Sequence, residues 1–253
     1  LAVASLVAFN PQFIYLSAAI NNDILAALMG TAVLVLCTQV VRAGATRRRA
    51  LLLGAVYGAS LLTKLHLAAL GAVIVAARAL ARCADRGEPD RSAIVLLVRD
   101  LALIFGVAVV IAGWWFVRNW RLYGDPTGMT QLNAMWGGRS AQGHLWALVQ
   151  GVPYLWSSLW GRFGYGQIPL PTIATDWLLV LFVLSLLGWL RAWWVSVLRR
   201  HFQARGLSIK LGPPLLGDGS DEMPTSELGK TAAVYGLLAL ALALFLGVVG
   251  YYI

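Results

Sequence analysis

The sequence predicts an all-α protein, a polytopic transmembrane bundle of about six to seven membrane segments with an extracytoplasmic region of interfacial helix. Of its 253 residues, 59% are hydrophobic and only 12% are charged, whereas soluble domains are about half apolar and about a quarter charged. The apolar residues form long, nearly charge-free runs at 24–41, 67–80, 101–117, 178–190 and 232–253. Most of these runs approach the roughly 20 residues that cross a bilayer, and a backbone in lipid must satisfy its own hydrogen bonds, so the runs are predicted to be helices.

The N-terminal part of the sequence indicates a broken helix followed by a first crossing. Residues 1–9 resemble the end of a helix, which Asn10-Pro11 interrupts, and a short apolar segment follows at 12–20. The first charge, Asp23, directly precedes the helix predicted at 24–41.

The next helix is predicted to begin near Ala50 and to carry Lys64, after which the chain returns through 67–81. At a rise of roughly 1.5 Å per residue, Lys64 lies about 20 Å above Arg49. We therefore expect Lys64 inside the membrane, below the far surface.

The remainder divides by composition. A short apolar piece at 93–98 is expected on the membrane surface, and a polar, aromatic region follows the crossing at 101–117. A helix is predicted at 176–198, and the next stretch is rich in Gly, Pro and acidic residues, which is typical of a linker. The chain is thus divided into a core at 1–203 with an extracytoplasmic loop at 118–175, a flexible cytoplasmic linker at 204–230 and a further transmembrane helix at 231–253. Because the sequence starts without Met and ends inside an apolar run, we expect it to be an internal fragment of a longer protein.

The basic residues predict the orientation. The crossings place on one side Arg42, Arg47 to Arg49, the arginines of 78–99, the basic residues from Arg191 to Lys210, and Lys230. The other side holds only Arg118, Arg121, Arg139 and Arg162. By the positive-inside rule the basic side is cytoplasmic. The net charge of +9 thus reports topology rather than nucleic-acid binding.

Tryptophans concentrate in the predicted extracytoplasmic region. Apolar residues recur at helical spacing over 145–160, interrupted by Pro153, which predicts a helix lying in the membrane interface. An aromatic belt at headgroup level explains most of the rings, while one or two of them facing a cavity would suit stacking on a sugar.

Asp23 and Lys64 are the two charges most informative about function. Asp23 is either an N-cap of the following helix or a carboxylate at the mouth of a cavity, where it would bind an acceptor hydroxyl or a metal. An ionisable residue at bilayer depth is a functional candidate by default, so Lys64 is expected to hold the phosphate of a lipid carrier, with snorkelling to the headgroups as the alternative.

A dense polar cluster follows the helix predicted at 101–117. Arg118 and Arg121 lie one helical turn apart, so they can clamp one phosphate together, and Asn119 and Tyr123 lie beside them. The alternative role for this cluster is anchoring in the interface. For Asp125, which Tyr123-Gly124 precedes and Pro126 follows, a turn is the preferred interpretation.

Arg162 lies in a glycine-rich aromatic loop that would allow close approach to a ligand. No metal site is indicated, because His66, His144 and His201 share no spacing and the two cysteines form no ligand pattern. Cys37 and Cys83 are interpreted as packing residues. The sequence does not specify a cofactor, and a requirement for a divalent metal is not indicated.

Several short motifs carry a family resemblance. These are Asn10-Pro11-Gln12-Phe13 through Asn21-Asn22-Asp23, Leu61-Leu62-Thr63-Lys64, Trp114-Trp115-Phe116-Val117-Arg118-Asn119 through Tyr123-Gly124-Asp125-Pro126, and Ser158-Leu159-Trp160-Gly161-Arg162-Phe163-Gly164. With them, the sequence from Leu1 to about Leu190 resembles bacterial GT-C-type membrane glycosyltransferases. More narrowly, it resembles the protein-mannosyltransferase-like, phospholipid-carrier-dependent group and a related uncharacterised bacterial membrane family.

The resemblance implies an enzyme of the bacterial inner membrane that moves a sugar from a polyprenyl-phosphate carrier to an acceptor on the extracytoplasmic face, with inversion. The phosphate leaving group requires cations, which Lys64 or the extracytoplasmic arginines would supply. Asp23 resembles the second acid of the family and carries over as a supporting site residue. The main catalytic acid of the family lies in a first loop that would precede Leu1.

Two alternatives from other classes stay open. A lipid or solute transporter usually shows repeated halves with helices broken at the midplane, and the sequence shows no internal repeat. A non-catalytic subunit of a membrane complex would use Lys64 and Asp23 for packing alone. The expected partners are the lipid-linked donor and membrane lipids, without nucleic acid.

Overall fold

The computed structural model describes residues 2–86, 91–136, 144–164, 166–203 and 225–252, and almost all of its regular structure is helical. The elements are α1 (Ala2–Ala8), α2 (Pro11–Ala18), α3 (Asp23–Ala43), α4 (Arg47–Thr63), η1 (Leu65–Ala69), α5 (Leu70–Arg86), α6 (Arg91–Tyr123), α7 (Met129–Trp136), α8 (His144–Trp160), β1 (Arg162–Phe163), β2 (Ile168–Pro169), α9 (Thr172–Gln203) and α10 (Thr225–Tyr252). The predicted all-α class is confirmed.

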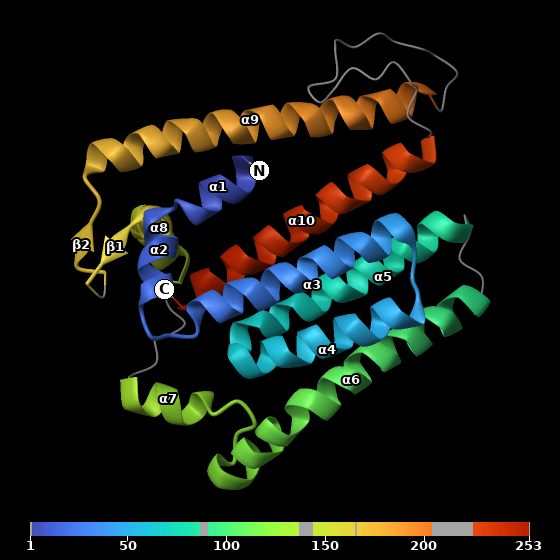
Figure 1. The fold of residues 1–253 in the computed structure, drawn as a ribbon, viewed down its shortest axis with the longest axis horizontal. Coiled ribbons are helices and arrows are strands. Elements are labelled where there is room, and N and C mark those ends of the chain that lie inside the picture. The colour runs from blue at the N-terminus through green and yellow to red at the C-terminus, as the bar shows by residue number, and fades with distance from the viewer. Residues whose placement is uncertain (1, 87–90, 137–143, 165, 204–224, 253) are drawn as a thin grey trace.

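Helices α3, α4, α5, α6 and α10 form one bundle in which consecutive helices run antiparallel (Figure 1). Their facing sides contribute one buried cluster, whose members include Val33, Cys37, Leu53, Ile74, Ile104 and Leu237. Cys37 is fully buried, as expected for a packing residue. The side chain of Cys83 lies outside the described residues.

Helices α4 and α6 approach each other most closely at two glycines. A Cβ atom on Gly54 would lie 2.5 Å from the carbonyl oxygen of Ile104, and one on Gly58 would lie 2.9 Å from the Cα of Ala108. Small residues four positions apart let two helix backbones pack in direct contact, which is how helices associate in lipid.

Within the part of the chain that the structure describes, four helical segments are long and apolar enough to cross a membrane: Asp23–Ala43, Leu65–Arg82, Ile94–Tyr123 and Thr172–Val195. These spans indicate a membrane protein, and the expected count of six to seven crossings is not confirmed. Helix α9 lies along one side of the molecule (Figure 1), and only 6% of its most apolar window is buried. In a membrane, lipid would cover such a surface.

The two ends of the bundle differ in what they carry. The Asp23 end comprises the start of α3, the junction of α4 with η1, the end of α6 and the start of α9. The β1–β2 hairpin and α8 also lie there (Figure 1). The Arg47 end comprises the turn from α3 to α4, the start of α6 and the end of α9. Of the basic residues predicted to share one side, Arg42 and Arg47 to Arg49 lie around the α3–α4 turn at this end.

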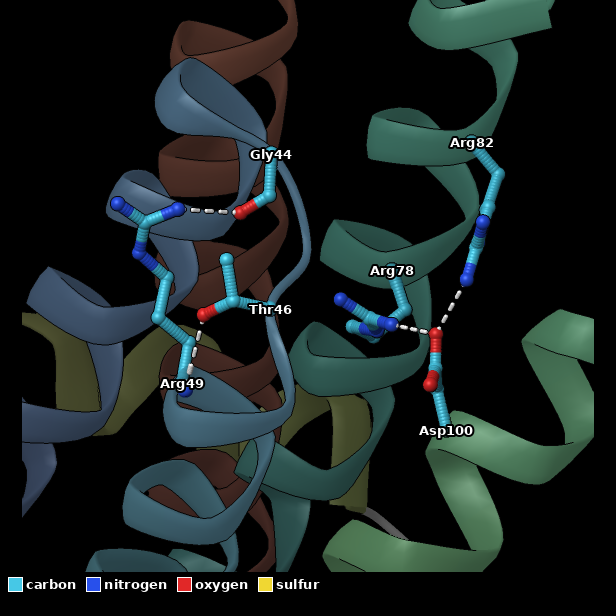
Figure 2. A network of polar contacts seen from close by, with 6 residues as sticks. All are labelled: Gly44, Thr46, Arg49, Arg78, Arg82 and Asp100. Carbon is cyan, nitrogen blue, oxygen red and sulfur yellow. Dashed lines mark hydrogen bonds and ion pairs between the residues drawn. The ribbon is translucent and has the colours of Figure 1, made fainter.

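Helix α6 differs from the expectation. The piece at 93–98 is not a separate surface segment, and the helix does not stop at Val117, because a single helix runs from Arg91 to Tyr123. The charge of Asp100 does not interrupt it, since the carboxylate pairs with Arg78 and, at 2.5 Å, with Arg82 of α5 (Figure 2).

The segments around the bundle follow the predicted pattern with shifted ends. Asn10 caps α2 by accepting from the Phe13 amide at 3.0 Å, which confirms the break predicted at Asn10-Pro11. The predicted helix is present as α8, but Pro153 lies inside it and does not interrupt it. Helix α8 is seen nearly end-on in Figure 1, so its axis crosses that of the bundle. Helix α10 already begins at Thr225, inside the predicted linker, whose residues 204–224 lie outside the described part.

Candidate functional site

Asp23 and Lys64 form an ion pair at the Asp23 end of the bundle. Lys64 was expected within a helix, but α4 ends at Thr63. Lys64 has an extended backbone, with φ −152° and ψ 132°, before the chain enters η1. The side chains remain 28% exposed for Lys64 and 39% exposed for Asp23. A solute or a lipid headgroup can therefore still reach both charges.

The polar residues before α3 hold this pair in place. The side-chain amide of Asn22 donates to the carbonyl oxygen of Thr63 at 2.8 Å, which fixes the start of α3 against the end of α4. The backbone amide of Asp23 donates to the side chain of Asn21 at 3.0 Å. Asn22, not Asp23, occupies the cap position of α3, so the N-cap alternative for Asp23 is wrong.

One further titratable group lies close to the pair. His66 follows Lys64 by two residues within η1 and interacts electrostatically with both Lys64 and Asp23. The sequence pattern predicts no role for this histidine, because it shares no spacing with the other histidines. The signal that could have found it is its position two residues after Lys64.

The predicted phosphate clamp lies at the exposed end of α6. The Arg118 guanidinium lies 5.2 Å from the centre of the Trp115 ring, a cation–π distance, and Arg121 and Tyr123 are exposed. Asn119 is buried, and its side-chain amide donates to the carbonyl oxygen of Pro126 at 3.3 Å. Asn119 thus fastens the turn after α6, whereas its neighbours face outward.

Asp125 organises the turn that leads into α7. Its carboxylate accepts four hydrogen bonds of 2.8–2.9 Å, from the amide and hydroxyl groups of Thr127 and Thr130. These bonds hold the pKa of the Asp125 carboxyl well below its usual range, with the backbone amides of Thr130 and then Thr127 contributing most. The turn interpretation of Asp125 is confirmed.

Arg162 lies in the β1–β2 hairpin and is held by its neighbours. Its guanidinium lies 4.2 Å from the centre of the Tyr154 ring, and its Nε donates to the carbonyl oxygen of Gly166 at 3.0 Å. Its backbone amide donates to the side chain of Gln12 at 2.8 Å. Gly164 and Gly166 adopt backbone φ values of 57° and 86°, which residues other than glycine rarely adopt.

Trp156 and Trp160 pack within the protein. The Trp156 indole donates to the carbonyl oxygen of Thr175 at 3.0 Å and packs edge-on against Trp160, with ring centres 5.6 Å apart. By contrast, Trp114, Trp120 and Trp177 are more than half exposed, which fits an aromatic belt.

Of the predicted site residues, the structure brings Asp23 and Lys64 into contact and leaves the others in separate groups. The end of α6 and the β1–β2 hairpin lie apart, on either side of the start of α3 (Figure 1). Arg118 and Arg162 therefore do not act on one phosphate in this arrangement. Within the described ranges, no group of three or more His, Cys, Asp and Glu side chains could hold a metal ion.

Comparison of the chain with models of protein families, with curated proteins and with solved structures finds no match to any of them.

Proposed function

We propose that this chain belongs to a membrane glycosyltransferase of the GT-C type. It would move a sugar from a polyprenyl-phosphate carrier to an acceptor on the extracytoplasmic face of a bacterial inner membrane. The observation that supports the proposal is the half-exposed Asp23–Lys64 pair, which joins two of the motifs that carry the family resemblance. The basic Arg47 end would then face the cytoplasm, following the positive-inside rule.

The pair offers the two kinds of group that this transfer requires. An ammonium carries three donors, of which the Asp23 contact uses one, so Lys64 has donors left for the oxygens of a carrier phosphate. Among the described residues, none donates to Oδ2 of Asp23, so this oxygen can accept a bond from the hydroxyl of an acceptor. The two substrates would meet where α3 begins and α4 ends.

The proposed step is an inverting displacement. The acceptor oxygen forms a bond to the anomeric carbon while the bond from that carbon to the carrier phosphate breaks, and the phosphate leaves with the electron pair. Lys64 stabilises the charge that develops on the phosphate. Asp23 orients the attacking hydroxyl, whose proton passes to a carboxylate or to water.

The experiment uses the full-length protein in proteoliposomes with a radiolabelled polyprenyl-phosphate sugar and crude envelope acceptors. Asp23→Asn and Lys64→Gln are each expected to lower transfer by roughly tenfold or more, the lower range for loss of one positioned catalytic group. Asp176→Asn is the matched control, because Asp176 is an exposed carboxylate at the same end of the bundle. Transfer that is unchanged in both pair variants would refute the assignment of the site.

A non-catalytic membrane subunit is the second candidate, because Asp23 and Lys64 neutralise each other and neighbours hold Arg162. The exchange of charges in Asp23→Lys with Lys64→Asp separates the two. A purely structural pair regains its thermal stability in the double variant and shows no transfer in the wild type. A catalytic pair regains stability and stays inactive, since the cation and the carboxylate have changed places.

A further inference from the structure

Exposed arginines collect at the Arg47 end, and none of them pairs with a carboxylate that the structure describes. Arg42 ends α3, Arg47 and Arg48 begin α4, and all three are exposed. None of them forms an ion pair within the part of the chain that the structure describes. No described carboxylate therefore neutralises these three charges.

The described acidic side chain at this end already pairs with other arginines. Among the acidic side chains that the structure describes, Asp100 alone lies at this end, and it pairs with both Arg78 and Arg82 (Figure 2). One carboxylate thus serves two guanidinium groups, and this cluster adds a further positive charge. Val41, Ala50 and Ala77 belong to the same buried cluster, which places the α3–α4 turn close to this triad.

Arg49 has a different task from Arg47 and Arg48. Its guanidinium donates to the carbonyl oxygens of Ala43 at 2.6 Å and Gly44 at 2.7 Å, so it closes the α3–α4 turn. Arg47 and Arg48 lie in the same first turn of α4, where the helix dipole disfavours positive charge and where no acid is present. Two exposed arginines in an unfavourable position are best explained by an anion that compensates them.

The apolar surface next to these arginines indicates what kind of anion they bind. Leu51 and Leu52 are 40% and 45% exposed. Each follows one of the arginines by four residues, so Arg47 lies above Leu51, and Arg48 above Leu52, on the same faces of α4. A charged rim that continues into an exposed apolar strip matches a molecule with an anionic head and an acyl tail.

We propose that Arg42, Arg47 and Arg48 bind the phosphate headgroup of an anionic phospholipid whose acyl chain lies along Leu51 and Leu52. The lipid belongs to the leaflet at the Arg47 end, where basic residues next to a membrane helix attract anionic headgroups. The proposal does not depend on the proposed enzymatic function, since the site lies at the opposite end of the bundle from Asp23 and Lys64.

The test measures lipid binding to the purified protein in a mild nonionic detergent by native mass spectrometry. Phosphatidylglycerol and phosphatidylcholine are titrated separately. Phosphatidylglycerol is expected to bind more tightly, and Arg47→Gln with Arg48→Gln is expected to weaken it. An attraction of about 1 kcal/mol per arginine corresponds to a factor of about five for each substitution and of about 25 for both, if they add.

The control is Arg118→Gln with Arg121→Gln, which removes the same charge from exposed positions at the other end of the bundle. Equal losses in the two double variants would overturn the proposal, because a general charge effect would then explain the binding. Equal affinity of the wild type for the two lipids would also overturn it. If the α4 double variant does not fold, the single variant Arg48→Gln, with its expected fivefold loss, takes its place.

Two soluble probes separate a lipid site from a phosphate site. Inorganic phosphate and glycerol 3-phosphate, each at millimolar concentration, are expected to leave the bound phosphatidylglycerol in place, because neither contacts the leucines. Displacement of the lipid by either probe would overturn the assignment of an acyl-chain contact and with it the proposal.

Discussion

The close contact of α4 with α6 predicts a large effect of adding one methyl group to a glycine. A Cβ on Gly54 would lie 2.5 Å from the carbonyl oxygen of Ile104 and 2.9 Å from the Cβ of Val107. Ordinary contacts begin at 3.4 Å, so the two backbones would have to separate by about 0.9 Å. Because one of the clashing atoms belongs to the backbone, a change of rotamer cannot relieve the contact.

The magnitude follows from two opposing terms. Overpacking a tight contact costs about 1–3 kcal/mol, and a clash with backbone lies at the upper end of this range. Replacing glycine by alanine within a helix returns about 1 kcal/mol of helix propensity. The free energy of unfolding of Gly54→Ala is therefore expected to fall by about 2 kcal/mol. At about 2–4 °C per kcal/mol, the Tm falls by several degrees.

The assay is thermal unfolding in detergent, followed by tryptophan fluorescence. Gly106→Ala is the matched control, because Gly106 also lies within a bundle helix and an added Cβ there meets nothing within 4 Å. This control is expected to be neutral or slightly stabilising. A Tm of Gly54→Ala equal to that of the wild type, or an equal loss in Gly106→Ala, would refute the glycine contact between α4 and α6.

Two further predictions concern charges. Asp100→Asn is expected to destabilise the protein by about 2–4 kcal/mol, because it removes the carboxylate that pairs with the buried Arg78 and the partly buried Arg82. Thermal unfolding measures this loss. The control is Arg99→Gln, a change at an exposed neighbour, which is expected to alter the free energy of unfolding by no more than about 0.5 kcal/mol. Asp125→Ala is expected to speed hydrogen exchange at the Thr130 amide, and an unchanged rate would show that the carboxylate does not hold the turn. Since the folded-state pKa of Asp125 is lowered, the stability it gives to the turn is fully present above its unfolded pKa and is lost only as the pH falls through the low folded value.

The hydropathy of the sequence was sufficient to predict the helical class. Residues within a single turn of the chain were sufficient to predict a helix start and a turn. Asn10-Pro11 predicts a helix start because both residues act within one turn of the chain, and Asp125 predicts a turn for the same reason. The predicted helix ends were less accurate where distant residues decide them. Helix α6 continues through Asp100 because Arg78 and Arg82 of α5 pair with the Asp100 carboxylate. These partners lie 22 and 18 positions away in the sequence.

The candidate site shows the same division between local and distant causes. Asp23 and Lys64 each stand out in the sequence as isolated charges beside apolar runs, but nothing in the sequence pairs residues 41 positions apart. The spacing of Gly54 and Gly58 is typical of close helix packing, yet the spacing does not name α6 as the partner. Such choices depend on which helices the bundle places side by side.

Two of the motifs behind the family resemblance contact each other, which gives them a common physical task. Asn10 donates from its side chain to the carbonyl oxygen of Leu159 at 3.1 Å, and Gln12 accepts from the Arg162 amide at 2.8 Å. The ring of Tyr15 also packs edge-on against Phe163. These contacts anchor the α2 segment and the β1–β2 hairpin to one another, and the chain then leads directly from α2 to Asp23. A change such as Gln12→Ala therefore acts on Arg162 and on the approach to Asp23 together, so loss of activity in that variant alone would not identify Gln12 as a contact of the substrate.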